Sequence, residues 1–304
     1  MGATLRLAAG PLSAEVIPAM GGGVARFDFT HEGAVTEIFR GCPRQGPRDP
    51  NELGLYVLAP WSNRISGGGF RFGGLFHPLT TNVAGEPFPI HGDAWQALWS
   101  VEAHEIGRVL LGRDSQGPGP FRYQAALAYE LSPDRLSVRL TMTNSGDAAL
   151  PFGGGFHPWL PRTARTRLIA PARSVWLEDE RHLPTQNVPA DSRPDWDFDL
   201  ARPLPDDWIN NCFSDWNGRA TILWEDRALA LDIWASPPIG AYILNSPSAD
   251  SSFFCFEPVT HAVDAHNLAP GPEAHGLVTL APGAALVLAC QFIVRAGAAG
   301  ASPP

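Results

Sequence analysis

The strongest constraint on the fold is a two-residue alternation of apolar and polar side chains in the middle of the chain. In residues 135–143, the four apolar side chains from Leu136 to Met142 fall on one face, and arginine, serine and threonine fall on the other. This period is that of a half-buried β-strand. Residues 123–131 predict a second strand, and Ser132, Pro133 and Asp134 are typical turn residues. The pattern therefore predicts a β-hairpin.

Similar short apolar segments recur along the chain. Thirty-one glycines and 30 prolines are scattered between them, without a repeat, which suits many short strands better than long helices. Only residues 200–211 suggest a short helix. We therefore expect an all-β fold, a large antiparallel β-sandwich, formed as a single domain by residues 1–295. Residues 296–304 predict a disordered C-terminal tail.

Composition narrows the possible partners and compartment. The formal net charge of −9 argues against nucleic acid, because phosphate binding needs clustered lysine and arginine. No apolar run is long enough to span a membrane, and the N-terminus lacks the apolar core of a signal peptide. The four cysteines lie far apart in the sequence and show no metal-binding spacing. This pattern predicts buried free thiols in a reducing compartment. We therefore expect a cytoplasmic protein that binds neither nucleic acid nor membrane.

Glu257 is the first candidate for acid–base chemistry. It follows an apolar, aromatic run, residues 253–256, that predicts a buried strand, and Pro258 is expected to end the regular pairing. A carboxyl group at the end of an apolar strand loses hydration, which moves its pKa toward neutrality. The alternative is a structural glutamate paired with an arginine.

Two histidines and an arginine lie in comparable surroundings. His157 stands between a glycine triplet and Pro158, and His91 stands between an apolar segment and Gly92. Each could be a neutral core histidine or a proton carrier. Arg64 could brace its turn, or offer a fork of donors to sugar hydroxyls. Ten tryptophans fit a core, but also a sugar site, because aromatic faces pack against pyranose rings.

A metal site is the main competing interpretation of the polar residues. His261, Asp264 and His266 follow Glu257 closely and could bind zinc or iron if His91 or His157 came near. No His-x-His or His-Glu-x-x-His pattern occurs, and no phosphate-binding glycine loop or serine-nucleophile motif occurs either. We therefore expect no metal.

Taken together, these segments resemble a known family. Five motifs occur in order, namely Asn63-Arg-Ile65, Pro89-Ile-His-Gly92, Phe156-His-Pro-Trp159, Asn211-Cys-Phe-Ser-Asp-Trp-Asn-Gly218 and Phe256-Glu-Pro-Val-Thr-His261. They resemble the aldose 1-epimerases, the galactose mutarotase-like proteins, and in particular a bacterial branch of that family. The resemblance extends over nearly the whole chain and implies a galactose mutarotase-like β-supersandwich.

The resemblance also implies roles for individual residues. Glu257 would be the general base for the C1 hydroxyl of a monosaccharide, and His157 the general acid for the ring oxygen. The expected substrate-binding residues are Asn63, Arg64, His91, Trp159 and Asn210. No cofactor is implied, since anomer exchange needs neither a redox step nor a covalent adduct.

Asn210 marks a departure from the family, whose members often have an aspartate there. Asp206 or Asp207 could replace that carboxylate in space. The identity of the sugar therefore stays open.

Two other functions remain as alternatives. A sugar-phosphate mutarotase would need basic residues at the pocket rim, for which Arg44, Arg48 and Arg71 are candidates. A non-catalytic carbohydrate-binding or sensing protein would need neither Glu257 nor His157. A homodimer is possible through an exposed sheet face.

Overall fold

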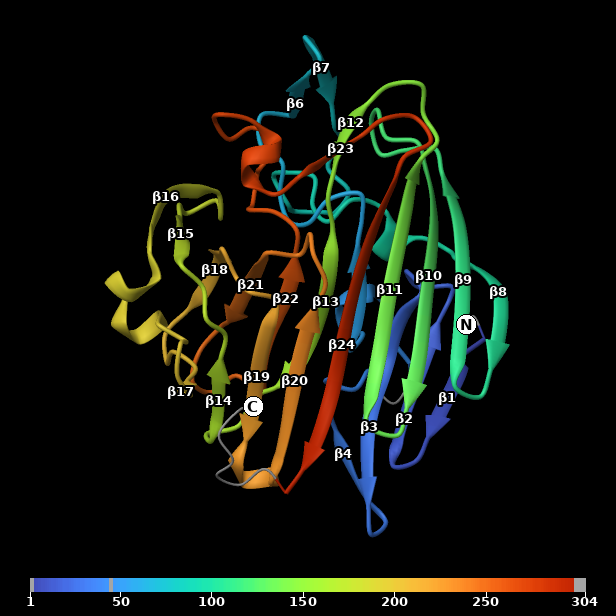
Figure 1. Ribbon diagram of the computed structural model, residues 1–304, viewed down its shortest axis with the longest axis vertical. Coiled ribbons are helices and arrows are strands. Elements are labelled where there is room, and N and C mark those ends of the chain that lie inside the picture. The colour runs from blue at the N-terminus through green and yellow to red at the C-terminus, as the bar shows by residue number, and fades with distance from the viewer. Residues whose placement is uncertain (1–2, 44–45, 298–304) are drawn as a thin grey trace.

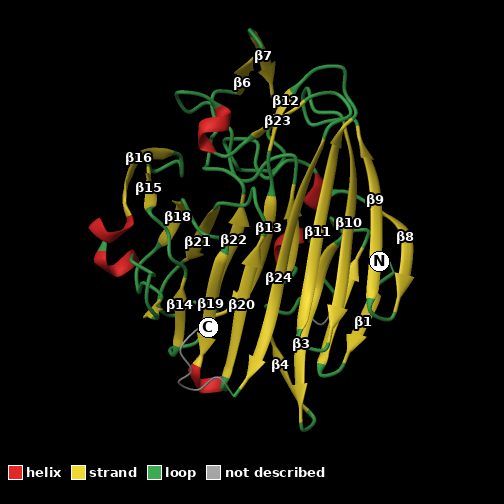
Figure 2. Ribbon diagram, in the orientation of Figure 1, coloured by secondary structure: helices red, strands yellow, loops and turns green. Residues whose placement is uncertain are grey.

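Two large antiparallel sheets, packed face to face, form most of the protein (Figures 1 and 2). The computed structural model describes residues 3–43 and 46–297. Within that part of the chain, the first sheet has 11 strands in the order β1-β2-β3-β5-β13-β22-β21-β18-β15-β16, with β4 beside β3, and the second has nine in the order β17-β14-β19-β20-β24-β11-β10-β9-β8.

The strands of the first sheet are β1 (Leu5–Ala9), β2 (Leu12–Ile17), β3 (Gly23–His31), β4 (Ala34–Glu37), β5 (Leu55–Leu58), β13 (Gly155–Pro161), β15 (Ser174–Glu178), β16 (Pro184–Pro189), β18 (Ile209–Ser214), β21 (Ala241–Ser246) and β22 (Phe253–Val259). Those of the second are β8 (Ser100–Glu105), β9 (Arg108–Ser115), β10 (Tyr123–Ser132), β11 (Arg135–Asn144), β14 (Thr166–Ile169), β17 (Arg202–Pro203), β19 (Arg219–Trp224), β20 (Leu229–Ala235) and β24 (Ala285–Ala296). Two small two-stranded sheets are formed by β6 (Gly69–Phe72) with β7 (Leu75–Pro78), and by β12 (Leu150–Phe152) with β23 (Val278–Leu280).

The helical segments within the described ranges are single turns of 3-10 helix, three or four residues long. They are η1 (Pro50–Glu52), η2 (Ala94–Gln96), η3 (Ala190–Ser192), η4 (Pro194–Trp196), η5 (Glu225–Arg227) and η6 (Pro272–His275). No helix in the described part of the chain is both long and apolar enough to cross a membrane.

The predicted all-β antiparallel sandwich is therefore confirmed. The predicted hairpin is present as well, since β10 and β11 pair through to Ser132 opposite Arg135. The suggested helix at residues 200–211 is wrong, because this segment contains β17 and the start of β18. Of the predicted C-terminal tail, Ala296 is the last residue of β24, and residues 298–304 lie outside the described part of the chain.

Alternation along the strands divides the apolar residues between two cores. Phe254 and Phe256 of β22 point into the main core between the sheets, whereas Val259 belongs to a smaller cluster on the opposite face of the first sheet. Strand β5 divides its residues in the same way, with Val57 in the main core and Tyr56 in the smaller cluster. Because side chains alternate along a strand, Glu257 lies on the face of the smaller cluster.

Pro258 does not end β22, contrary to the sequence-based expectation. The strand continues to Val259, and Pro258 stands opposite Tyr242 of β21. The glycine triplet that precedes His157 is packed against neighbouring strands. A Cβ atom on Gly155 would lie 2.2 Å from the carbonyl oxygen of Pro258, and one on Gly154 would lie 2.3 Å from that of Leu58. These glycines therefore allow close approach of β5, β13 and β22, not of a ligand.

Candidate active site

A pocket of about 220 Å³ opens on the face of the first sheet that carries the smaller cluster. All seven site residues predicted from the sequence line it, namely Asn63, Arg64, His91, His157, Trp159, Asn210 and Glu257. The other residues of its lining are Asn51, Tyr56, Val83, Glu86, Ile90, Trp95, His182, Trp208, Asn245 and Cys255. The pocket is smaller than typical drug-sized sites of roughly 300–1,000 Å³, so its size suits a ligand as small as a monosaccharide.

Strand register brings the two central side chains together. Strand β13 pairs with β22 so that Gly155 is opposite Val259 and Trp159 is opposite Cys255. The midpoint of this register places His157 directly opposite Glu257, and directly opposed side chains have Cβ atoms only about 4.5–5.5 Å apart. Nε2 of His157 accordingly lies 3.1 Å from Oε1 of Glu257.

Burial shifts the two groups in opposite directions. Glu257 is 3% exposed and His157 6% exposed. Loss of hydration raises the pKa of the Glu257 carboxyl to about 8, although the Arg64 guanidinium lowers it. Loss of hydration also lowers the pKa of His157 to about 3. Near neutral pH the pair therefore holds one transferable proton, and burial favours its position on Glu257.

Two polar atoms of this pair have no hydrogen-bond partner within the described residues. They are Oε2 of Glu257 and Nδ1 of His157, and both are buried. Buried polar atoms are almost always hydrogen-bonded, so such exceptions are frequent at functional sites. Oε2 of Glu257 is thus an acceptor without a donor, beside a pocket that could admit a hydroxyl group.

A stack of planar side chains fixes the ring of His157. Tyr56 lies on one side, with ring centroids 4.5 Å apart and planes 28° apart, and Trp159 lies 5.3 Å away at 25°. Trp95 extends the stack beyond Tyr56 at 5.2 Å. At the other end, the Arg40 guanidinium lies 3.9 Å from the ring centroid of Trp159. This packing restricts the imidazole, and the Arg40 charge is a further cause of its lowered pKa.

His91 and Asn63 hold each other in an uncommon backbone conformation. Their φ angles are 62° and 58°, in the left-handed region that costs non-glycine residues about 1–3 kcal/mol. The backbone N–H of Asn63 donates to Nδ1 of His91 at 3.0 Å, and the N–H of His91 donates to the carbonyl of Asn63 at 3.0 Å. Burial keeps the pKa of His91 well below its usual value. The neutral ring therefore carries its proton on Nε2, as a donor.

Arg64 is oriented by a carboxylate that the sequence motifs did not include. Its Nε and Nη2 donate to the two carboxylate oxygens of Glu86 at 3.1 and 3.0 Å, and Nη1 lies 3.4 Å from Oδ1 of Asn63. A paired, planar contact of this kind fixes a guanidinium group more firmly than a single hydrogen bond does.

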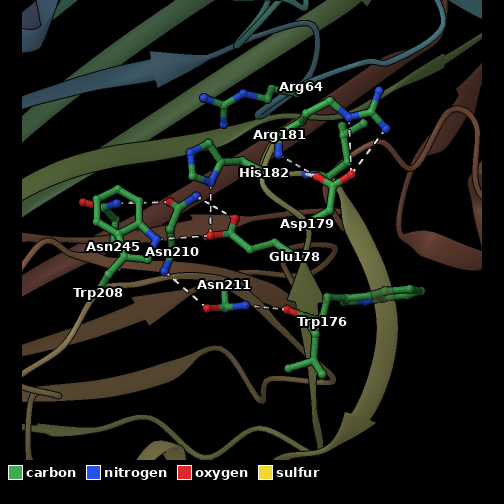
Figure 3. A network of polar contacts seen from close by, with 12 residues as sticks. Arg64, Trp176, Glu178, Asp179, Arg181, His182, Trp208, Asn210, Asn211 and Asn245 are labelled. Carbon is green, nitrogen blue, oxygen red and sulfur yellow. Dashed lines mark hydrogen bonds and ion pairs between the residues drawn. The ribbon is translucent and has the colours of Figure 1, made fainter.

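The opposite wall contains a polar network built around Glu178, at the end of β15 (Figure 3). Its Oε2 accepts a hydrogen bond from Nδ2 of Asn210 at 3.0 Å, and its Oε1 accepts one from Nε1 of Trp208 at 3.2 Å. Nδ1 of His182 also lies 3.1 Å from Oε1, in a geometry that does not make a hydrogen bond. Nδ2 of Asn245 donates to Oδ1 of Asn210 at 3.1 Å. These contacts fix the direction of the Asn210 amide.

The carboxylate beside Asn210 is therefore Glu178, and not Asp206 or Asp207 as the sequence suggested. Neither aspartate lines the pocket, and the Asp206 side chain is 90% exposed. Glu178 and Glu86 gave no signal in the sequence because both lie outside the five motifs. Tyr56 and Trp95 stand within or beside recognised segments, but their stacking depends on tertiary structure.

The residues considered as metal ligands instead contact backbone and side-chain groups of neighbouring segments. Nε2 of His261 accepts from the N–H of Ser62 at 3.0 Å, and Asp264 accepts from the N–H and hydroxyl of Ser66 at 2.9 and 2.6 Å. Nε2 of His266 lies 3.1 Å from the carbonyl of Pro151. Across residues 3–43 and 46–297, no group of three or more His, Cys, Asp or Glu side chains has a metal-binding arrangement.

Two of the three arginines considered as phosphate ligands, Arg48 and Arg71, lie away from the pocket. Arg48 pairs with Glu52 at 3.2 Å, the Arg71 guanidinium lies 5.8 Å from the ring centroid of Phe76, and neither lines the pocket. Arg44 lies outside the described residues. The carboxylate of Glu86 lines the pocket, next to the guanidinium of Arg64, and would oppose a phosphate there.

Comparison with known proteins identifies relatives of the whole chain. The family model described as aldose 1-epimerase matches residues 4–292. YphB, an uncharacterized protein of Escherichia coli K12, is 33% identical over 276 residues, which are 86% of this chain and 92% of YphB. A crystal structure of a candidate aldose 1-epimerase from E. coli K12 has a TM-score of 0.88 and 30% identity, covering 97% of this chain and 99% of that one. A galactose mutarotase-like protein of Clostridium acetobutylicum shares the fold, with a TM-score of 0.83, 23% identity and coverage of 96% and 94%.

Proposed function

Because the chain belongs to the aldose 1-epimerase family, we propose that it interconverts the α and β anomers of a free aldose. The observation that carries this proposal is the buried, directly opposed pair of Glu257 and His157 in a pocket of monosaccharide size. Positioned acid–base groups of this kind each contribute roughly 10²–10⁴-fold to a rate. The reaction needs no redox step and no covalent adduct, so we propose that no cofactor takes part.

The ring opens by two proton transfers. Glu257 takes the proton of the C1 hydroxyl, and His157 gives a proton to the ring oxygen O5 as the C1–O5 bond breaks. The product is an open-chain aldehyde, which turns about C1–C2 before the same transfers run in reverse. Closure on the other carbonyl face gives the other anomer. Each cycle returns both protons, so the net charge of the pair never changes.

The proton that burial favours on Glu257 fits the second half of this cycle. After ring opening, Glu257 is protonated and His157 is neutral, which is the arrangement that burial favours. A cyclic sugar needs the other arrangement, with a Glu257 carboxylate. Two contacts stabilise that carboxylate, the charge of Arg64 and a hydroxyl donated to the unpartnered Oε2. Substrate binding therefore moves the proton toward His157.

The remaining predicted residues bind the sugar. Asn63, Arg64 and His91 present donors on one wall, Trp159 offers a ring face, and Asn210 presents an amide on the other wall. The polar groups of the two walls hold the ring between them, with C1 and O5 at the Glu257–His157 pair. Arg64 and His91 contact the sugar from the side of the ring oxygen.

The test is anomer exchange in freshly dissolved α-D-glucose and α-D-galactose, followed by polarimetry and by saturation-transfer NMR. Wild type is compared with Glu257→Gln and His157→Ala, and circular dichroism verifies that each variant is folded. Acceleration by wild type that both substitutions abolish supports the proposal. Sugar binding without faster exchange would instead support a non-catalytic carbohydrate-binding protein. Glucose 6-phosphate, run in parallel, tests the sugar-phosphate alternative.

A further inference from the structure

A second cavity adjoins the pocket at Trp208. Its volume is about 690 Å³, and its lining residues are Arg193, Asp195, Trp196, Arg202, Pro203, Leu204, Pro205, Asp206, Asp207 and Trp208. Trp208 lines both this cavity and the smaller pocket. The two spaces therefore meet at this residue, and a ligand long enough to extend past it would occupy both.

Trp208 is exposed but held in place. Its side chain belongs to the exposed large hydrophobic residues, at 50% exposure. Its Nε1 donates to Oε1 of Glu178 at 3.2 Å, and its ring lies 5.7 Å from that of His182 at an angle of 35° (Figure 3). Because the indole is already fixed through its N–H, little side-chain entropy is lost when a ligand binds. Its apolar face is suited to pack against the C–H face of a sugar.

The walls of the second cavity are braced by the rest of the protein. The buried Arg162 side chain donates from Nη2 to the carbonyl of Pro205 at 2.9 Å, and the N–H of Ala249 donates to the carbonyl of Asp206 at 2.8 Å. Trp196 adds a second aromatic surface, with the Arg193 guanidinium 4.2 Å from its ring centroid. The walls of the cavity are therefore held in place by contacts within the protein.

The polar groups of this cavity favour a neutral ligand with many hydroxyls. The lining contains two guanidinium groups, Arg193 and Arg202, and three carboxylates, those of Asp195, Asp206 and Asp207, so it has no excess positive charge for a phosphate. Nε of Arg202 is buried without a hydrogen-bond partner among the described residues. Donors, acceptors and two indole rings together are the groups that recognise a sugar ring.

We propose that this cavity is a subsite for a second sugar unit, so that the preferred substrate is a disaccharide or longer oligosaccharide whose reducing-end unit occupies the pocket at Glu257. This substrate class rests on the proposed function, because the reducing-end unit would be the one that undergoes anomer exchange at Glu257. Trp208 stacks near the linkage between the two units, Trp196 contacts the second unit, and Glu178 is a positioning residue that acts through Trp208 and Asn210.

The experiment compares glucose with maltose, cellobiose and lactose, which have a reducing glucose unit in common. Anomer exchange is measured by NMR for wild type, Trp196→Ala and Arg193→Met, and circular dichroism verifies folding. Saturation-transfer difference spectra of the same samples report which sugar ring contacts the protein, independently of turnover. Because Trp196 and Arg193 lie outside the pocket, exchange of glucose is expected to be unchanged in both variants.

We expect kcat/KM for at least one disaccharide to exceed that for glucose, and to fall about fivefold to tenfold in Trp196→Ala, as loss of one aromatic contact predicts. Saturation of the second ring should weaken in parallel. Exchange of glucose and disaccharides with equal kcat/KM, unaffected by either variant, would refute the subsite and leave the proposed function standing. Binding of both disaccharide rings without anomer exchange would refute the proposed function and support the subsite. No binding and no exchange would refute both.

Discussion

Replacing Glu257 with glutamine should abolish activity and at the same time stabilise the fold. The carboxyl group has an ordinary pKa of 4.5 when unfolded, and burial raises its pKa to about 8 in the folded protein. The folded state therefore holds this proton more tightly than the unfolded state does. The resulting stability is fully present below pH 4.5 and is lost as the pH rises to 8.

The size of the effect follows from the two pKa values. Each unit of difference corresponds to about 1.4 kcal/mol, so proton release by Glu257 in the unfolded chain lowers the stability of the wild type by roughly 3 kcal/mol at pH 7 and roughly 4 kcal/mol at pH 8. Glutamine has a similar shape and no proton to release. The free energy of unfolding of Glu257→Gln should therefore equal that of wild type near pH 4 and exceed it by these amounts at higher pH.

Urea unfolding of both proteins at pH 4, 6 and 8 measures this difference, and other titrating groups cancel in the comparison. The melting temperature at pH 8 should rise by roughly 5–10 °C, while anomer exchange falls by about 10²–10⁴-fold. Glu105→Gln, on the exposed strand β8, is the control for loss of one negative charge. A stability difference that is the same at pH 4 and pH 8, or a less stable Glu257→Gln at pH 8, would refute the reasoning.

Three further outcomes are expected. The rate of anomer exchange should fall as the pH rises above about 8, because the pair loses its transferable proton; a rate measured by NMR that stays constant to pH 10 would contradict this. Glu178→Gln should raise KM about tenfold with kcat nearly unchanged, because Trp208 and Asn210 donate to different carboxylate oxygens and glutamine has an NH2 group in place of one of them; a fall in kcat alone would indicate a different role. Gly92→Ala should lower the free energy of unfolding by more than about 2 kcal/mol, because φ is 65° and the new Cβ would lie 2.0 Å from the Ala59 carbonyl oxygen. Thermal unfolding measures that loss, and a variant as stable as wild type would contradict it.

Local pattern was enough to predict the sandwich, and together with the family resemblance it predicted seven of the residues that line the pocket. Alternation in residues 135–143 identifies a strand by itself, because the two-residue period follows from backbone geometry. His91, His157 and Glu257 stood out because each interrupts an apolar or glycine-rich segment with a titratable group. The helix suggested for residues 200–211 failed, because isolated local propensity is weaker than pairing with neighbouring strands.

The acid–base candidates, and their place on or beside short apolar segments, can be identified from the amino-acid sequence. That His157 faces Glu257 cannot, since it depends on the register of β13 and β22, two strands that lie far apart in the sequence. Tertiary contacts also bring Glu178, from the edge region of the sheet, beside Asn210, and make Trp208 part of the lining of two cavities. Distances, burial and the resulting pKa values depend on contacts between segments that are distant in the sequence. Local sequence patterns do not specify which distant segments meet.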